Sequence, residues 1–242
     1  MSPQPRPDES LRPALEALAE RDGDIARHYE ICGLPPERRR PEGFAGLVHI
    51  IVAQQVSAAA ANTIIARLEA AARPLTPETF LSLDEAAFKG IGLSRQKARY
   101  GRALAEGLLA GSLDLDGLSG LEDEAAIERL TQAKGIGRWS AEIYLLFAMR
   151  RPDVWPAGDL AVQAATQRVK GLDERPGRAV LVEIAEPWRP YRSAAARFLW
   201  HVYRHPGLPD PSSAAAAAHS AEAAASAAKA GLPLLRRVEG EA

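Results

Sequence analysis

The spacing of apolar and polar residues along the chain predicts a protein built of helices. From Leu11 to Ile31, apolar residues recur three and four positions apart, which is typical of an amphipathic helix, and Asp22-Gly23-Asp24 interrupts the pattern. The stretch 44–72 is largely apolar and contains no proline, so we expect two core helices, over about 44–54 and 57–72. Short β-branched runs fall within helical spacing, and the predicted fold class is therefore all-α.

Capping residues place the remaining helices. Ser57 is a candidate N-cap of the second core helix, and Thr76, which precedes a proline, opens a helix that we expect to end before Lys89. Ser94 opens another helix, which Gly111 closes. Further helices are expected over about 123–132, 138–150, 160–171, 174–186 and 191–203.

Composition divides the chain into five segments. Residues 1–9 are Pro-rich and polar, and we expect them to be disordered. The helical stretches between the two ends fall into residues 10–43, 44–150 and 151–205. Residues 206–242 are a Pro-, Ser- and Ala-rich tail, whose Ala run supports at most a marginal helix because it has no core to join.

Composition also restricts the class of protein. The chain has 242 residues, 47% of them hydrophobic, which is enough for one large core or two small ones. A single cysteine, Cys32, excludes a disulfide framework, a Cys-based zinc site and a four-cysteine iron–sulfur cluster within this chain. The N-terminus has no apolar signal segment and no apolar run is long enough to cross a bilayer, so we expect a soluble, cytoplasmic protein without membrane contact.

The distribution of charge is more informative than its sum. The formal net charge is −1, which counts against a strongly basic nucleic-acid-binding domain. Between Lys89 and Arg102, however, all charged residues are basic, and a second basic group lies within 134–151. Such clusters suit DNA phosphates, but they are equally common on solvated helix faces.

The tetrapeptide Lys-Gly-Ile-Gly occurs twice, at 89–92 and 134–137, each time between two predicted helices. Glycine adopts positive φ without strain and lets another molecule approach the backbone. The amides that begin the next helix lack intrahelical partners, and together with the helix dipole they suit an anion such as phosphate. The plainer alternative is that the glycines serve only a tight connection between helices.

The wider context of the second turn resembles a known family. KGIGRWSA at 134–141 is followed about twenty residues later by Asp159 in WPAGDLAV, an order that resembles the helix-hairpin-helix–Gly/Pro–Asp superfamily of DNA glycosylases. VAQQVSAAAA (52–61) is similar to the segment from which this family inserts a side chain into DNA. WRPYRSAAARFLWHVY (188–203) is similar to the last core helix of its 3-methyladenine DNA glycosylase II, or alkylation-repair, branch, and the resemblance covers roughly 40–205.

This resemblance implies a fold, an activity and a partner. The fold would have two helical subdomains with a cleft between them. Helices within 10–43 would pack with the C-terminal helices of 151–205, the segment that also holds the catalytic loop, and the helical core at 44–150 would contain the helix-hairpin-helix at about 124–150. The implied enzyme is a monofunctional glycosylase of base excision repair, which flips out alkylated, cationic purines such as 3-methyladenine and 7-methylguanine and hydrolyses the N-glycosidic bond. Its partner would be double-stranded DNA containing damaged bases, bound by a monomer, within the nucleoid if the protein is bacterial.

Asp159 is the candidate catalytic residue. As the base departs, positive charge develops on the deoxyribose, and a carboxylate beneath the sugar stabilises this charge and orients the attacking water. The residue pattern alone also fits a simple helix N-cap, and the resemblance assigns the catalytic role. Lyase-type members carry a Schiff-base lysine after the Gly-Arg of the hairpin, whereas Trp139 stands here, so we expect no β-lyase activity.

Aromatic residues are candidates for the base pocket. The resemblance places Trp139 and Trp200 around the flipped base, where the face of an indole attracts a cationic ring. Tyr144 is a further pocket candidate. A tryptophan in an apolar helix can instead belong to the core, and this is the role that we expect for Trp155 and Trp188.

The remaining candidates contact DNA or an ion. The resemblance matches Gln55, beside Gln54, to the residue that fills the space left by the flipped base. It assigns DNA contacts at the hairpin to Lys134, Gly135, Gly137, Arg138 and Ser140. No cofactor is required, although the carbonyls matching those of Thr131, Ala133 and Ile136 hold a structural Na⁺ or K⁺ in relatives. The first turn, at 89–92, is expected to connect two core helices, with Arg95 or Lys97 near the DNA backbone.

Two other functions stay open on the sequence. A non-catalytic helix-hairpin-helix DNA-binding protein would account for the glycines and arginines, but not for Asp159 with two placed tryptophans. A glycosylase acting on uracil, hypoxanthine or mismatched bases would share these motifs, because the shape of the pocket decides which base is accepted.

Overall fold

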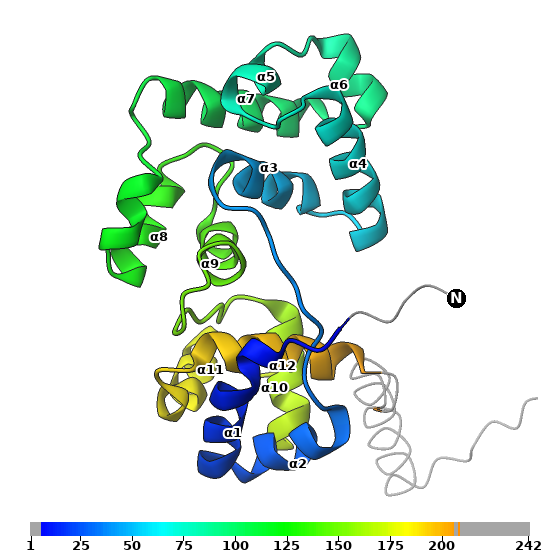
Figure 1. Cartoon of the computed structure of the whole chain (residues 1–242). Coiled ribbons are helices and arrows are strands. Elements are labelled where there is room, and N and C mark those ends of the chain that lie inside the picture. The colour runs from blue at the N-terminus through cyan, green and yellow to red at the C-terminus, as the bar shows by residue number, and fades with distance from the viewer. Residues whose placement is uncertain (1–5, 206–207, 209–242) are drawn as a thin grey trace, which may run out of the picture.

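Every regular element in the structure, a computed structural model that describes residues 6–205 and residue 208, is a helix (Figure 1). This confirms the all-α prediction. The sheet-like pairing within these residues is an isolated bridge between Pro7 and Pro36. None of the described helices is both long enough and apolar enough to cross a membrane. The predicted tail at 206–242 lies outside the described residues, apart from residue 208.

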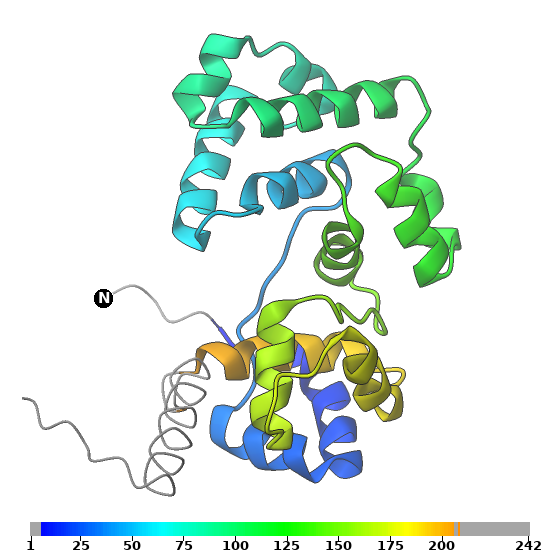
Figure 2. The ribbon, with the colours of Figure 1, turned by 180° about the vertical axis from the view of Figure 1, so that it is seen from behind.

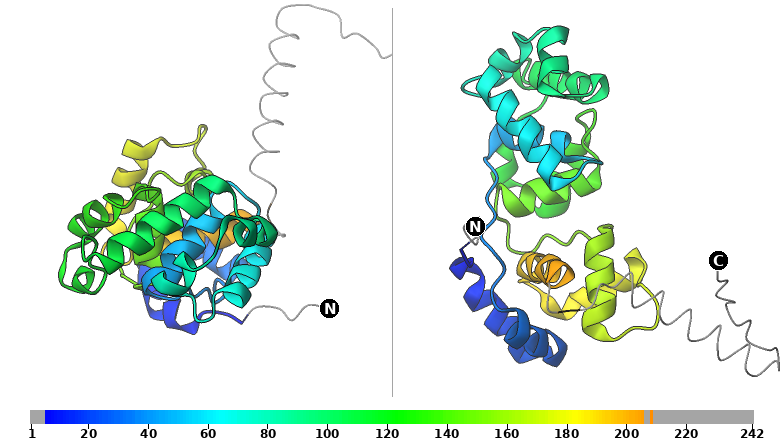
Figure 3. Two further views of the ribbon diagram at one scale, coloured as in Figure 1. Left: turned by 90° about the horizontal axis from the view of Figure 1, so that it is seen from above. Right: turned by 90° about the vertical axis from the view of Figure 1, so that its right-hand side faces the viewer.

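The helices form two lobes (Figures 1 and 3). One lobe contains α3 (Gly43–Ala53), α4 (Ala58–Ala71), α5 (Pro77–Leu81), α6 (Glu85–Ile91), α7 (Arg95–Leu109), α8 (Asp123–Thr131) and α9 (Arg138–Phe147). The other contains α1 (Arg12–Arg21), α2 (Gly23–Cys32), α10 (Leu160–Lys170), α11 (Arg178–Ala185) and α12 (Arg192–Arg204). Short 3-10 helices are η1 (Glu9–Leu11), η2 (Asp116–Gly120) and η3 (Glu186–Trp188).

The second lobe joins segments from both ends of the described chain. Helix α1 packs on α12 and α2 packs on α10, while the chain passes between the lobes at 33–42 and again at 148–159 (Figure 2). A cavity of about 90 Å³ lies where segment 33–42, Phe147 of α9 and α12 meet. Its lining residues are Pro35, Pro36, Arg38, Phe147, Arg197, Trp200, His201 and Arg204.

The helix starts follow the predicted caps, but one predicted helix is two. Ser57 and Ser94 each accept a hydrogen bond from the amide three residues on, as N-caps do. The helix expected to run up to the first glycine turn is interrupted, because Asp84 caps a new helix, α6. Helix α6 continues through Ile91, so only Gly92 of this turn is left-handed, with φ of +91°.

Two chain segments differ from the sequence-based expectation. The predicted N-terminal disorder does not extend to residues 6–9, because Asp8 is 7% exposed, caps η1 and forms an ion pair with Arg197 of α12. Helix α9 ends at Phe147 rather than at position 150, where Arg150 has φ of +53° and cannot continue a helix.

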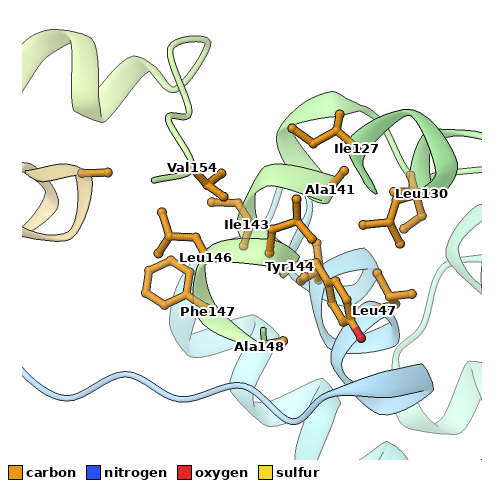
Figure 4. Close-up of a cluster of buried hydrophobic side chains, with 14 of the residues drawn as sticks. Leu47, Ile127, Leu130, Ala141, Ile143, Tyr144, Leu146, Phe147, Ala148 and Val154 are labelled. Atoms are coloured by element: carbon orange, nitrogen blue, oxygen red, sulfur yellow. The ribbon is translucent and has the colours of Figure 1, made fainter. Parts of the chain in front are cut away.

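Helix α9 is the centre of the first lobe (Figure 4). Every residue from Ser140 to Phe147 is buried, and the helix packs against α3 and α8, with Leu47, Ile127 and Leu130 among the neighbouring side chains. Burying each such aliphatic side chain stabilises the fold by about 1.5–3 kcal/mol. The helix that follows the second glycine turn is therefore a fixed part of the core.

Candidate active site

The carboxylate of Asp159 accepts hydrogen bonds from four N–H groups. The amides of Ala161 and Val162 donate to its Oδ1 at 2.9 and 3.0 Å, so Asp159 is the N-cap of α10. The indole N–H of Trp200 donates to the same oxygen at 3.0 Å, and the indole N–H of Trp139 donates to Oδ2 at 2.8 Å. Asp159 is thus an N-cap, as the residue pattern alone allowed, and its carboxylate also accepts the N–H groups of two tryptophans.

These contacts bring one residue of each lobe to the same carboxylate. Trp139 lies in the first turn of α9, in the first lobe, and Trp200 lies in α12, in the second. The N-terminal end of α10, with its unpaired amides, complements a negative charge at Asp159. The carboxylate is thus held in one orientation at the point where the two lobes meet.

The loop that leads to Asp159 is held by further hydrogen bonds. The amide of Val154 donates to Oγ of Ser193 at 2.9 Å, and the side-chain amide of Gln163 donates to the carbonyl of Ala157 at 3.0 Å. The amide of Asp159 closes a turn onto the carbonyl of residue 156 at 2.9 Å. These hydrogen bonds fix the loop and with it the position of the Asp159 carboxylate.

Trp155 and Trp188 belong to the core, the role that we expected for them. They are 8% and 1% exposed, and their rings meet edge to face with centroids 5.4 Å apart. Their indole N–H groups donate to the carbonyl of Leu181 at 3.1 Å and to Asp22 Oδ2 at 2.7 Å.

Two apolar residues that were not among the predicted site residues adjoin members of the cluster of Asp159, Trp139 and Trp200. The ring of Phe147 packs against that of Trp200, with centroids 5.5 Å apart and planes 30° apart. Leu160, the residue after Asp159, is 63% exposed, and Trp139 is 38% exposed. Phe147 follows Trp139 by eight positions on α9 and could have been found from helical periodicity, whereas no sequence pattern distinguishes Leu160.

Tyr144 lies in the core and not in this cluster. It follows Trp139 by five positions, which turns its side chain by about 140° around the helix. Its ring is 2% exposed, and its hydroxyl accepts the amide N–H of Gly43 at 2.8 Å (Figure 4). Burial raises the pKa of this phenol. The structure therefore corrects the expectation that Tyr144 lines the base pocket.

The two glycines of the second turn meet different requirements. Gly135 has φ of +91°, and a Cβ there would lie 2.3 Å from Cγ of Tyr100, so both the backbone and the space demand glycine. Gly137 is the N-cap of α9, and a Cβ there would meet nothing within 4 Å. Lys134 is exposed beside them. The turn thus leaves the backbone at Gly137 open to another molecule.

Arg138, a predicted DNA contact, is paired within the hairpin. Its guanidinium forms an ion pair with Glu124 of α8, and its Nε donates to Glu142 of α9 at 2.9 Å. Hydrogen bonding to Glu124 raises the pKa of Arg138, while burial raises the pKa of Glu142 to about 7. In this structure Arg138 joins α8 to α9.

Gln54 connects the end of α3 to the hairpin. Its side-chain amide donates to the carbonyl of Gly135 at 3.0 Å and to Oγ of Ser140 at 3.1 Å. Ser140, a predicted DNA contact, is buried, whereas Gln55 is exposed and has φ of +55°. The second glycine turn, the start of α7 and the end of α3 border one groove of about 520 Å³, lined by Gln54, Gln55, Ser94, Gln96, Lys97, Tyr100, Gly135, Ile136 and Gly137.

The predicted cation ligands are main-chain oxygens at this turn. The carbonyl of Ala133 accepts the amide N–H of Ile136 at 3.0 Å and has a second lone pair. Neutral carbonyl oxygens suit a weakly bound monovalent cation. Within residues 6–205 and 208, no group of three or more His, Cys, Asp or Glu side chains is placed to hold a metal ion.

Known proteins are similar to this chain in sequence and in fold. A family model described as "HhH-GPD superfamily base excision DNA repair protein" matches residues 48–190. DNA-3-methyladenine glycosylase 1 of Schizosaccharomyces pombe is 32% identical over 165 residues, which cover 66% of this chain and 72% of that protein. The structure of a 3-methyladenine DNA glycosylase from the same organism with abasic DNA aligns with a TM-score of 0.74 and 29% identity over 81% of this chain and 99% of that one. A DNA-3-methyladenine glycosidase from Bacillus halodurans aligns with a TM-score of 0.72 and 31% identity over 82% and 93%.

Proposed function

The chain belongs to the HhH-GPD superfamily of base excision DNA repair proteins, and from this we propose that it is a monofunctional DNA glycosylase that excises alkylated purines such as 3-methyladenine and 7-methylguanine. The observation that carries the proposal is the convergence of two indole N–H groups, one from each lobe, on the carboxylate of Asp159. The names of the relatives, which are 3-methyladenine glycosylases, support the class of base.

The chemistry follows from the charges. The deoxyribose of a flipped nucleotide becomes cationic as the glycosidic bond breaks, and the Asp159 carboxylate stabilises that charge and orients water. Trp139 and Trp200 hold this carboxylate by their N–H edges, which leaves the exposed ring of Trp139, and the face of Trp200 turned away from Phe147, to meet a cationic base. Purines alkylated at N3 or N7 already carry positive charge, so the leaving base needs no general acid. With Trp139 in place of a Schiff-base lysine, the product is an intact abasic strand.

Double-stranded DNA is the proposed partner of a monomeric, cytoplasmic enzyme. The open backbone at Gly137, the N-terminal end of α9 and the exposed Lys134 support a phosphate contact at the hairpin. The exposed Gln55 is proposed to fill the space that the flipped base leaves. We include in this proposal a Na⁺ or K⁺ bound by the carbonyls of Thr131, Ala133 and Ile136, between the hairpin and the phosphate.

The test is base release from DNA that contains 3-methyladenine or 7-methylguanine. We expect release without strand nicking by the wild type, and a rate at least about 100-fold lower for Asp159→Asn. Asparagine is as good an N-cap as aspartate, so this variant keeps the start of α10 and separates catalysis from folding. Release of uracil with no release of 3-methyladenine would change the substrate class. DNA binding with no release of any base would refute the proposal that the protein is an enzyme.

A further inference from the structure

A lysine from α7 holds the end of α3. Helix α3 ends at Ala53, so the carbonyls of its last turn lack helical partners. The Nζ of Lys97 donates to the carbonyl of Val52 at 2.8 Å and to the carbonyl of Gln54 at 2.7 Å. Both acceptors are main-chain oxygens, so this ammonium fixes the path of the backbone. Burial lowers the pKa of Lys97.

The backbone directly after these carbonyls is in an unfavourable conformation. Gln55 has φ of +55°, and the left-handed conformation is unfavourable for a residue with a Cβ, because the Cβ comes too close to the carbonyl oxygen that follows. Gln55, Val56 and Ser57 are all exposed, so their own side chains do not pack the loop into place. The conformation is therefore imposed through Gln54, whose main chain Lys97 holds and whose side chain the hairpin holds.

The contacts that hold residue 54 come from segments next to the two glycine turns. In the first turn Gly92 is the C-cap of α6, and Ser94 then caps α7, which places Lys97 in the first turn of a helix that packs against α3. In the second turn Gly135 provides the carbonyl that accepts from Gln54. Lys97, at the start of the helix after the first turn, and Gly135 of the second turn thus both hold residue 54.

We propose that Lys97 is a positioning residue for base flipping, which holds the backbone of residues 54 and 55 so that Gln55 projects into the duplex as the damaged base leaves the stack. The inference rests on the proposed function, because it assigns Gln55 to the vacated space. Lys97 acts through this loop and does not touch the reacting atoms. Its effect is therefore confined to duplex DNA, since a lesion in a single strand leaves no paired stack to open or to fill.

The experiment compares one lesion in duplex and in single-stranded DNA. Lys97→Met keeps the length of the side chain but removes its donors, and Lys97→Arg restores them. For Lys97→Met we expect the single-turnover rate at saturating enzyme to fall about tenfold on the duplex and to change less than twofold on the single strand, while Lys97→Arg recovers most of the duplex rate. Lys89→Met, an exposed lysine of α6, is the matched control for loss of one charge.

A second readout needs no chemistry. The fluorescence of 2-aminopurine placed beside an abasic site reports unstacking when the protein binds, and we expect a smaller increase with Lys97→Met than with wild type or Lys89→Met. An equal fall in rate on both DNA forms, or an unchanged fluorescence response, would overturn the proposal. If the wild type releases no base, the proposed function fails, and the fluorescence comparison still tests Lys97. Thermal melting checks each variant, and Lys97→Gln replaces Lys97→Met if the latter does not fold.

Discussion

Replacing Gly135 with alanine tests whether the conformation of the hairpin depends on a single position. The residue has φ of +91°, and its new Cβ would lie 2.3, 2.5 and 2.8 Å from Cγ, Cδ2 and Cβ of Tyr100. The hydroxyl of Tyr100 accepts a hydrogen bond from Gln96 at 2.6 Å, so the ring is tethered at its far end. Alanine would therefore force either the turn or the ring to move.

The expected loss of stability is the sum of two effects. A left-handed backbone costs a residue with a Cβ about 1–2 kcal/mol. Displacing a packed ring costs about 1–3 kcal/mol, so the free energy of unfolding should fall by about 2–5 kcal/mol. For a protein of about this size, 1 kcal/mol lowers Tm by about 2–4 °C, which predicts a decrease of roughly 4–20 °C.

Thermal and urea unfolding followed by circular dichroism measure this loss, and Gly137→Ala is the matched control. Its Cβ would lie in open space and its φ is −88°, so its stability should change by less than about 1 kcal/mol. The same methyl group would cover the backbone proposed to meet phosphate, so Gly137→Ala should weaken binding to abasic duplex. The two substitutions should thus separate stability from DNA binding.

Equal melting temperatures for the two variants would refute the steric reasoning. A further check uses Tyr100→Ala, which removes the ring that the new Cβ would meet. In that background Gly135→Ala should cost only the backbone share, about 1–2 kcal/mol. If the full cost persists without the ring, the contact with Tyr100 is not its cause.

Three further substitutions test other contacts. Trp200→Phe keeps an aromatic ring but removes the N–H that Asp159 accepts, and we expect roughly tenfold slower base release in single-turnover assays with nearly unchanged stability. Tyr144→Phe leaves the amide of Gly43 without its acceptor, which should lower the free energy of unfolding by about 1–3 kcal/mol in urea and leave the release rate unchanged. Glu142 has a pKa of about 7 in the folded protein, whereas an ordinary glutamate has a pKa of 4.5. Between these two pH values the folded state therefore binds more protons than the unfolded state. Stability should therefore fall as pH rises from about 4.5 to 7, by at most roughly 3 kcal/mol, and Glu142→Gln should lack this part of the dependence in urea titrations at several pH values.

A different result would contradict each of these three predictions. Wild-type rates for Trp200→Phe would show that the indole N–H does not support Asp159. Slow base release by Tyr144→Phe, at wild-type stability, would show that Tyr144 belongs to the active site after all. Parallel pH profiles for the wild type and Glu142→Gln would show that burial does not disfavour the charge of Glu142.

Signals local in the sequence were sufficient for most helix starts. A serine or aspartate whose side chain caps the next few amides works through neighbours in the chain, so Ser57, Ser94 and Asp159 could be placed without knowing the fold. The same signal was overlooked at Asp84, and one predicted helix became α5 and α6. The resemblance to the glycosylase family also followed from short segments, and the family model matched 48–190 within the expected 40–205.

Side-chain roles were harder to predict because they depend on direction. Tyr144 belongs to the right helix but faces α3, and Arg138 belongs to the right turn but is paired with carboxylates from two helices. A motif records which residue is present and not what lies against it. Where a partner comes from another helix, only packing reveals whether a charge is free to meet DNA.

The sequence by itself determined most helix starts, because a capping side chain acts on amides only a few residues away, and the resemblance of short segments to the glycosylase family singled out Asp159 as the candidate carboxylate. Only the tertiary structure decided that Trp139 and Trp200 meet at Asp159 and that Lys97 holds the carbonyls at the end of α3. These hydrogen bonds join groups far apart in the chain. Their geometry is set by how the helices pack within and between the two lobes, and hydrophobic periodicity specifies which face of a helix is buried but not which side chain it will meet.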